Sequence, residues 1–454
     1  MQHQPGRRKR SNCGVGKLVA ACAVALYVYV IVKMNRHAPR HYDGPQLGES
    51  GDGFDATGET DDDADTIHLV FSTDCGGYQH WQSISSWYAS LAAGHRGPVT
   101  RIASGCSDEQ AATIRAEFRK IDKTGRFRLH AAPSTAIGGY KYSNKPGGLM
   151  HFLAHANIDA KFVALVDPDM IMLKPLTLDV APGTHRYHGK KLHESVVDGV
   201  AKTLSLFADL PQHVAQGAPA GQHFGVGGAW QRAGPGARSA WAQFSKSAVC
   251  GNDAPCTRTT AKEADEKFAV GPVYIMHVAD WQMLAPAWWE AMPRVHSQYP
   301  HLLAEMYALT MSAANLTTPW SQLSSYMVSD PRTTSPTEAW AWIDDLAARE
   351  GPTSVCAGAT ATMLPAATRS REVALPVFLH FCQRYDLAGY FFAKRRLAHD
   401  FFGCQSEPLA FDADAIIGGL GGMPSTVATR TAFMLCHIVP LMNSFLASYK
   451  RDAC

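Results

Sequence analysis

A short apolar segment that ends in two carboxylates constrains this chain more than any other feature. Residues Phe162–Val166 read Phe-Val-Ala-Leu-Val, the pattern of a strand buried on both faces of a sheet. Asp167, Pro168 and Asp169 follow directly. Ligands of open α/β sheets bind just beyond the carboxyl ends of such strands, and paired carboxylates bind hard divalent cations. The segment therefore predicts an α/β fold with a metal site at this strand end.

The same spacing has an ordinary alternative, because Asp-Pro pairs are common where strands turn into loops. Apolar character resumes at residues 170–173, directly after the acids. Two carboxylates that interrupt a buried stretch are costly without a cation or another partner, so we favour the metal site. A cation that keeps open positions on Asp167 and Asp169 can hold a substrate diphosphate, which indicates nucleotide-sugar chemistry.

The N-terminal part predicts a membrane anchor followed by a stem. Residues 18–32 are apolar without interruption and follow a basic cluster, which predicts a cytoplasmic tail over residues 1–17 and a transmembrane signal anchor over 18–32. A cleaved signal peptide is the alternative, but no small-residue cleavage site follows. Residues 33–66 have the composition of a flexible stem. We expect residues 67–454 to form one large globular domain of a type II membrane protein.

Composition supports a large folded domain outside the cytosol. The chain has 454 residues, of which 46% are hydrophobic, so it can bury a sizeable core. The net charge is only +2 and no basic stripe carries interleaved aromatics, which argues against nucleic acid as a partner. The cysteines after the predicted stem lack paired CxxC units, which favours disulfides over zinc. Cys250 and Cys256 flank a turn-forming loop that a local bridge can close.

Strand and helix patterns alternate along the predicted domain. This alternation predicts a mainly parallel sheet covered by helices. Near the C-terminus, Asp412-Ala413-Asp414 is predicted to be a surface turn, and residues 433–449 a packed helix rather than a second membrane span. Strands are predicted at 67–71, 98–104, 162–166, 270–277 and 376–381, and helices at 81–91, 108–121, from 149, from 280 and at 302–309.

Four further side chains are candidates for the site, each with an ordinary alternative. Lys145 precedes a predicted helix start, where free N–H groups and the helix dipole attract phosphate, although it can also be a solvated surface lysine. Glu305 is an acid in a mostly apolar helix, either facing solvent or functional. Asp280 opens a helix and can simply cap it. His380 lies on a short strand, where a lone histidine is more often a core residue than a ligand.

Taken in order, motifs spread over about residues 67–400 resemble the plant and green-algal hydroxyproline O-arabinosyltransferases and the related peptidyl-serine α-galactosyltransferases. Their order and number make the match more specific than any single motif. The matching pieces are Phe71-Ser72-Thr73-Asp74-Cys75, Thr100-Arg101, Asn144-Lys145-Pro146, Val166-Asp167-Pro168-Asp169-Met170, Val270-Gly271-Pro272-Val273, Leu284-Ala285-Pro286-Ala287-Trp288, Glu305-Met306-Tyr307 and Leu379-His380.

The resemblance implies a GT-A fold, in which a Rossmann-like sheet carries an acidic pair that binds a divalent cation, usually Mn²⁺. The cation would hold the diphosphate of a UDP-sugar and neutralise the leaving group. By this resemblance the metal ligands are Asp167, Asp169 and His380; the residues on the nucleotide side are Asp167, Thr73, Arg101 and Lys145; and the acids near the acceptor or anomeric carbon are Glu305 and Asp280.

The implied activity is retaining sugar transfer to extensin-like cell-wall glycoproteins, with a hydroxyproline- or serine-containing protein as acceptor. The resemblance also implies that residues 67–454 are a lumenal catalytic domain in the Golgi or ER. Pro168 between the acids favours L-arabinofuranose transfer to hydroxyproline, whereas Ser72-Thr73-Asp74-Cys75 and Met276-His277 with Asp280 favour serine galactosylation. Arabinosyl transfer is the preferred prediction. Two alternatives remain: a non-catalytic lumenal protein that binds glycoprotein or nucleotide, and a metal-dependent phosphohydrolase, which would need further His and Asp clusters.

Overall fold

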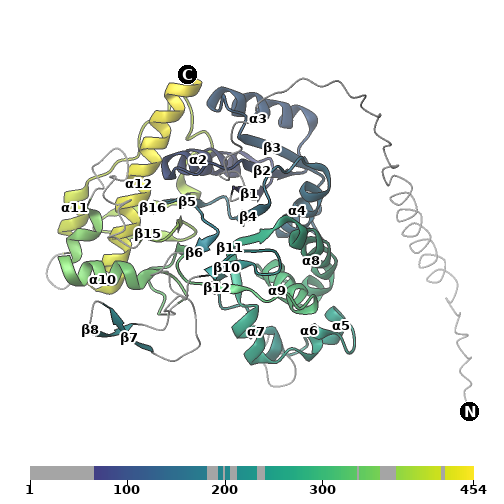
Figure 1. Cartoon of the computed structure of the whole chain (residues 1–454). Helices are drawn as coiled ribbons and strands as arrows, with labels where there is room; N and C mark the ends of the chain where they lie inside the picture. The colour runs from purple at the N-terminus through teal and green to yellow at the C-terminus, as the bar shows by residue number, and fades with distance from the viewer. Residues whose placement is uncertain are drawn as a thin grey trace, which may run out of the picture. The chain divides into compact units, whose positions relative to one another are not determined.

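The computed structural model describes residues 66–180, 193–197, 200–204, 212–232, 241–334, 337–357, 375–420 and 425–454. The predicted tail, anchor and stem fall within residues 1–66, and all but the last of these residues lie outside the described part of the chain. The elements below belong to one compact unit, Thr60–Cys454 (Figure 1).

A seven-stranded sheet forms the centre of this unit, in the order β12-β10-β11-β4-β1-β2-β3. Strands β4, β1, β2 and β3 are parallel to one another, β11 is antiparallel to both β4 and β10, and β12 is parallel to β10. The prediction of a mainly parallel sheet is therefore confirmed. The strands are β1 (Ile67–Thr73), β2 (Val99–Ser104), β3 (Phe127–Ala132), β4 (Phe162–Val166), β10 (Ala220–His223), β11 (Val270–His277) and β12 (Ser321–Leu323).

The strand order reverses beside β1. The chain runs outward from β1 to β2 and β3 and then returns to β4 on the other side of β1. At the carboxyl edge Phe71 of β1 pairs with Val166 of β4. A reversal of this kind leaves a crevice outside the carboxyl ends of the two strands, where open α/β sheets bind ligands. Thr73 and Asp167 both stand at this point.

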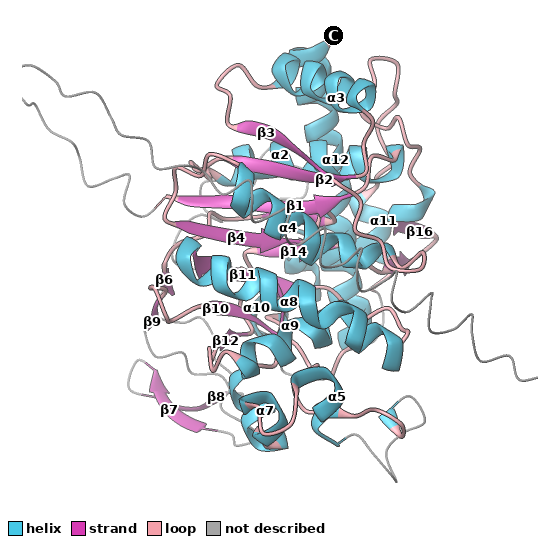
Figure 2. Ribbon diagram, turned by 90° about the vertical axis from the view of Figure 1, so that its right-hand side faces the viewer, coloured by secondary structure: helices cyan, strands magenta, loops and turns pink. Residues whose placement is uncertain are grey.

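Helices cover both faces of the sheet (Figures 1 and 2). Alternate strand residues pack in the two cores on these faces. Leu69 and Phe71 pack in one core with Trp81 of α2. Val70 packs in the other core with Phe152 of α4. Because a strand projects successive side chains to opposite faces, β1 contributes to both cores. The covering helices are α2 (Gly77–Ala93) and α12 (Thr426–Ala453) on one side, and α4 (Asn144–His155), α8 (Val278–Gln298) and α9 (Ala304–Asn315) on the other.

A small sheet brings the C-terminal part of the chain to the strand end of β4. It has the order β13-β14-β5, with β13 (Met327–Val328), β14 (Phe378–His380) and β5 (Met170–Met172). In the antiparallel pair β14–β5, His380 lies opposite Met170. Since Met170 directly follows Asp169, this register places the histidine beside the acidic pair.

The remaining elements surround this frame. The paired short strands are β15 (Arg384–Leu387) with β16 (Tyr390–Ala393), β6 (Asp179–Val180) with β9 (Gln212–His213), and β7 (His193–Val197) with β8 (Val200–Leu204). The remaining helices are α3 (Asp108–Ile121), α5 (Lys246–Cys250), α6 (Pro255–Arg258), α7 (Ala261–Lys267), α10 (Trp340–Glu350), α11 (Ala413–Gly418), and the 3₁₀ turns η2 (Lys141–Ser143), η3 (Trp230–Arg232), η5 (Pro352–Cys356) and η6 (Lys394–Arg396).

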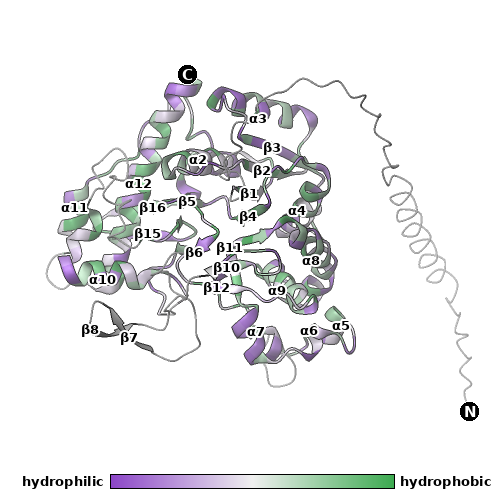
Figure 3. Cartoon of the chain, in the orientation of Figure 1, coloured by the Kyte–Doolittle hydropathy of each residue, from purple (hydrophilic) through white to green (hydrophobic). Residues whose placement is uncertain are grey.

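Helix α12 is a core helix. Among the described residues it alone is long and apolar enough to cross a membrane, yet 67% of its most apolar window is buried inside the protein. Its middle is hydrophobic and its C-terminal end is hydrophilic (Figure 3). The prediction of a packed terminal helix is confirmed. The turn predicted at Asp412-Ala413-Asp414 is instead the start of α11, where the Asp412 side chain accepts a hydrogen bond from the Ala415 N–H.

Four disulfides link the described part of the chain. The predicted local bridge between Cys250 and Cys256 is present. The other three are Cys75–Cys106, Cys356–Cys436 and Cys404–Cys454, and Cys382 is free. Cys75–Cys106 joins the loops that follow β1 and β2, so it braces the same edge of the sheet at which Asp167 lies.

Buried histidines should make the fold sensitive to acid. Burial lowers the pKa of His437 in α12 to about 4, and that of His68 in β1 to about 3. The unfolded chain therefore binds more protons below pH 6.5, and stability falls as the pH drops from 6.5 towards 4. For His437 the loss amounts to about 3 kcal/mol. Urea unfolding across this range should show a shallower pH slope for His437→Asn, and an unchanged slope would contradict the assignment.

Candidate metal and nucleotide site

Asp167, Asp169 and His380 come together beyond the carboxyl end of β4. Their ligand atoms all lie within 4.8 Å of one another. His380 Nε2 is 3.3 Å from Asp169 Oδ1 and 4.0 Å from Asp167 Oδ2. The Asp169 and His380 side chains are only 7% and 13% exposed. The three residues assigned to the metal by resemblance thus form one cluster, although His380 lies more than two hundred positions after the two acids in the sequence.

The cluster fits a divalent cation by its chemistry and its size. Carboxylate oxygens suit Mg²⁺ and Mn²⁺, and an imidazole nitrogen suits the transition metals, so two Asp and one His suit Mn²⁺. Ligands about 2.2 Å from a cation on opposite sides lie about 4.4 Å apart, close to the spread of these atoms. Three protein ligands leave positions open for substrate oxygens.

Lys145 connects this cluster to Glu305. Its Nζ lies 2.8 Å from Asp167 Oδ1 and 2.8 Å from Glu305 Oε1. The helix that carries Lys145 begins one residue before it, at Asn144, earlier than the sequence pattern indicated. Burial acts to lower the pKa of Lys145, but the two carboxylates raise it well above its ordinary value. The ammonium is therefore a fixed positive charge at the edge of the cluster.

Glu305 is held in place by its backbone as well as by Lys145. Its N–H donates to the Tyr140 hydroxyl at 3.1 Å, and its carbonyl accepts from the Trp288 indole N–H at 2.7 Å. Burial raises the pKa of Glu305, and Lys145 opposes that shift. One carboxylate oxygen, Oε2, is buried without a hydrogen-bond partner among the described residues. A buried acid with a free oxygen can accept a hydrogen bond from a substrate hydroxyl.

Lys394 belongs to the site and was not predicted. Its Nζ forms an ion pair with Asp169 Oδ2. Burial acts to raise the pKa of Asp169, whereas His380 and Lys394 hold it well below its ordinary value. The sequence signal was weak, because Lys394 opens the basic triplet Lys-Arg-Arg, a pattern typical of a solvated turn.

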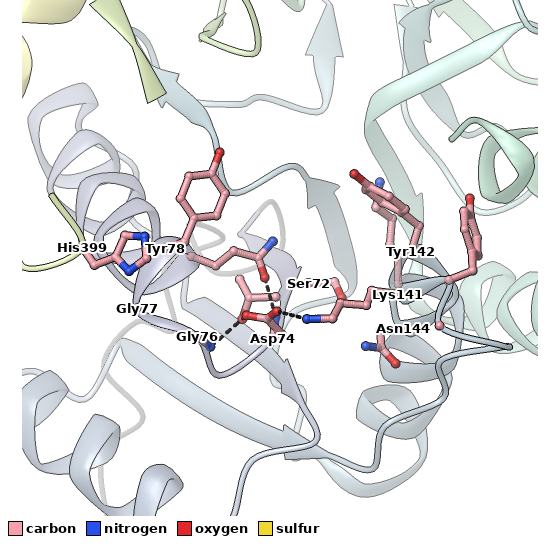
Figure 4. Close-up of a pocket in the computed structure, with 14 residues that line it drawn as sticks. Ser72, Asp74, Gly76, Gly77, Tyr78, Lys141, Tyr142, Asn144 and His399 are labelled. Carbon is pink, nitrogen blue, oxygen red and sulfur yellow. Dashed lines mark hydrogen bonds and ion pairs between the residues drawn. The ribbon is translucent and has the colours of Figure 1, made fainter. Parts of the chain in front are cut away.

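A cavity of about 470 Å³ lies next to Lys145. It is bounded by the loop after β1, the segment before α4, and His399. Figure 4 shows Tyr78 and His399 on one side of Asp74, and Lys141 and Tyr142 on the other. Asp74 Oδ1 accepts from the Gly76 N–H at 2.8 Å, and Oδ2 pairs with Lys141 Nζ at 3.2 Å. Aromatic walls around polar groups suit a small flat ligand with hydrogen-bonding edges.

Thr73 and Arg101, both predicted to face the nucleotide, have different positions. Thr73 lines the cavity. Arg101 is fully buried behind it and donates to Thr73 Oγ1 at 2.8 Å and to the Asp74 carbonyl at 2.7 Å. Arg101 therefore fixes the loop after β1 from behind rather than lining the cavity.

The structure does not bring Asp280 to this cluster. Because β11 runs antiparallel to β4, His277 at its end pairs with Phe162, the first residue of β4. Asp280, in the first turn of α8, therefore lies near the edge of the sheet opposite to Asp167. Its Oδ2 accepts from the Gly217 N–H at 2.7 Å. This placement does not fit the predicted role of Asp280 near the acceptor or the anomeric carbon, and Glu305 remains as the candidate acid.

Two curated proteins are similar to part of this chain. It is 33% identical over 113 residues to a peptidyl serine alpha-galactosyltransferase of Arabidopsis thaliana, and 29% identical over 114 residues to one of Chlamydomonas reinhardtii. These alignments cover 24% and 25% of this chain but only 14% and 15% of the relatives. No family model matches the chain.

Among solved structures, two of the galactosyltransferase LgtC match, one an active-site mutant and the other a complex with donor and acceptor sugar analogues. Each is 13% identical, with a TM-score of 0.33 over 70% of this chain and 87% of the other. A likeness at this level does not by itself define the fold, which rests on the strand order described above. The relatives and these structures are all glycosyltransferases, enzymes that transfer sugar.

The Lys145 bridge should carry much of the stability of the site. In Lys145→Met, Asp167 and Glu305 lose their shared counter-charge, and we expect a loss of about 3 kcal/mol or more in urea unfolding. The double variant Lys145→Met/Glu305→Gln should recover part of the lost free energy of unfolding. Lys141→Met is the matched control, because its side chain is 72% exposed and pairs with Asp74 at the surface, where a pair contributes under about 1 kcal/mol. Equal losses in the two lysine variants would contradict this account.

Proposed function

We propose that this chain is a metal-dependent glycosyltransferase of the GT-A type, which transfers a sugar from a UDP-sugar to a protein acceptor. The observation that carries the proposal is the Asp167, Asp169 and His380 cluster at the strand-order reversal, next to a cavity of about 470 Å³. A diphosphate bound to the cation would lie between this cluster and the cavity. Mn²⁺ is the cation that the ligand set and the resemblance favour.

Each residue of the site has a distinct task in this proposal. Asp167, Asp169 and His380 hold the cation, which acts as a Lewis acid on the diphosphate when bound. Lys145 keeps Asp167 and Glu305 in position and adds positive charge near the leaving group. Glu305 faces the reacting side with its free oxygen. The aromatic side chains and polar loop of the cavity receive the nucleoside.

The relatives favour galactose and serine over arabinose and hydroxyproline. Both matched proteins are named peptidyl serine alpha-galactosyltransferases, so we propose UDP-galactose as donor and peptidyl serine as acceptor. L-Arabinofuranose transfer to hydroxyproline, the prediction made from Pro168, is the competing outcome. Membrane anchoring through residues 18–32, with the domain in the Golgi or ER lumen, belongs to the same proposal.

A donor and acceptor screen tests this function. The full chain with Mn²⁺ should transfer galactose from UDP-galactose to a serine-containing peptide, and UDP-arabinofuranose with a hydroxyproline peptide distinguishes the competing activity. Loss of an outer-shell partner of a metal ligand costs about 10–100-fold, so Asp169→Asn should lose at least about 100-fold. Asp414→Asn is the matched control, since Asp412-Ala413-Asp414 has the same spacing on the exposed start of α11.

Two results would count against the proposal. Full turnover by Asp169→Asn would contradict the assignment of the acidic pair as metal ligands. Binding of UDP without turnover of any donor by the unmodified chain would instead support a non-catalytic lumenal protein that kept the fold.

A further inference from the structure

Lys394 forms an ion pair with the carboxylate oxygen of Asp169 that His380 does not contact. The Asp169 carboxylate contacts His380 Nε2 through Oδ1, at 3.3 Å, and Lys394 Nζ through Oδ2. Both partners come from the segment after β13, and the Asp169 side chain is only 7% exposed. Access to this carboxylate is therefore controlled by two side chains from a distant part of the sequence.

The two lysines of the site differ in how firmly they are held. Lys145 has two carboxylate partners and stays paired with Glu305 when Asp167 turns to another ligand. Among the ion pairs of the described residues, Lys394 has Asp169 alone. A cation that takes up Asp169 therefore leaves Lys145 paired and Lys394 without its partner.

A divalent cation alone would reverse the sign of the charge at the site, because three carboxylates and two ammonium groups sum to −1 and the cation brings the sum to +1. The carboxylates of Asp167, Asp169 and Glu305 already face the ammonium groups of Lys145 and Lys394. Two further positive charges in this buried place repel the lysines unless an anion arrives with them. A diphosphate supplies that anion.

The segment that carries Lys394 also reaches the cavity. Tyr78 and His399 line the cavity, and His399 follows Lys394 in the same turn-rich segment. The rings of Tyr78 and His399 lie 6.1 Å apart. Burial acts to lower the pKa of Lys394, whereas Asp169 and, to a smaller extent, Tyr78 raise it above its ordinary value. Lys394 thus connects the acidic cluster, through its ammonium, to the segment that forms a wall of the cavity.

We propose that Lys394 competes with the divalent cation for Asp169 and, once displaced, pairs with the donor diphosphate, so that cation and nucleotide bind as a coupled pair. This inference rests on the proposed function, because it assumes a nucleotide diphosphate at the site. Coupling between two ligands is reciprocal: whatever UDP adds to cation affinity, the cation adds to UDP affinity. Lys394 is the positioning residue that links them.

The test measures Mn²⁺ binding to the full chain by electron paramagnetic resonance of free Mn²⁺, with and without UDP. The unmodified chain should bind Mn²⁺ weakly alone and about fivefold or more tightly with UDP. Lys394→Met removes the competing ammonium, so it should bind Mn²⁺ alone about fivefold or more tightly than the unmodified chain. Its gain from UDP should shrink, because the displaced ammonium no longer meets the diphosphate.

Matched variants separate this role from general charge and from misfolding. Arg395→Met removes a positive charge from the same exposed turn and should leave both affinities unchanged. Lys394→Gln repeats the test with a polar side chain, and tighter binding of Mn²⁺ cannot result from a misfolded site. Weaker or unchanged Mn²⁺ binding by both Lys394 variants would overturn the role of Lys394 but not the proposed function. Absence of Mn²⁺ binding by the unmodified chain, even with UDP, would overturn the proposed function with it.

Discussion

Neutralisation of buried carboxylates at one edge of the sheet is the constraint on which this site depends. An unpaired charge in such a place costs several kcal/mol, so each acid needs a partner with suitable geometry. The partners come from the start of α4, from β14 and from the turn after β16, which ties three distant segments to the end of β4. The acids are Asp167, Asp169 and Glu305, and their partners are Lys145, His380 and Lys394.

The sheet supplies the geometry that this chemistry requires. Reversal of the strand order at β1 opens the crevice in which both Thr73 and Asp167 stand. The pairing of β14 with β5 then sets the position of His380 relative to Asp169. The candidate cation site and the cavity of about 470 Å³ thus follow from the same topology, and Lys145 contacts both.

Local sequence signals predicted the elements that are buried on both faces. They failed where long-range contacts determine the position of a strand or a side chain. The apolar run before Asp167 predicted β4 with the bounds that the structure shows. β3 was missed because this edge strand carries polar side chains such as Arg128 and His130. An apolar run does not reveal strand direction, so the position of Asp280 near the edge opposite to Asp167 could not be predicted from the run that forms β11. Lys394 meets Asp169 across 225 residues, a contact that no local pattern encodes.

In the proposed site, Asp167, Asp169 and His380 hold one cation. Pulsed electron paramagnetic resonance of Mn²⁺ bound in the presence of UDP tests this coordination most directly. A coordinated imidazole couples its nitrogen to the Mn²⁺ electron spin. If His380 coordinates Mn²⁺, this nitrogen coupling is present in the unmodified chain and is lost in His380→Gln. Bound Mn²⁺ without nitrogen coupling, or coupling that persists in His380→Gln, would contradict it.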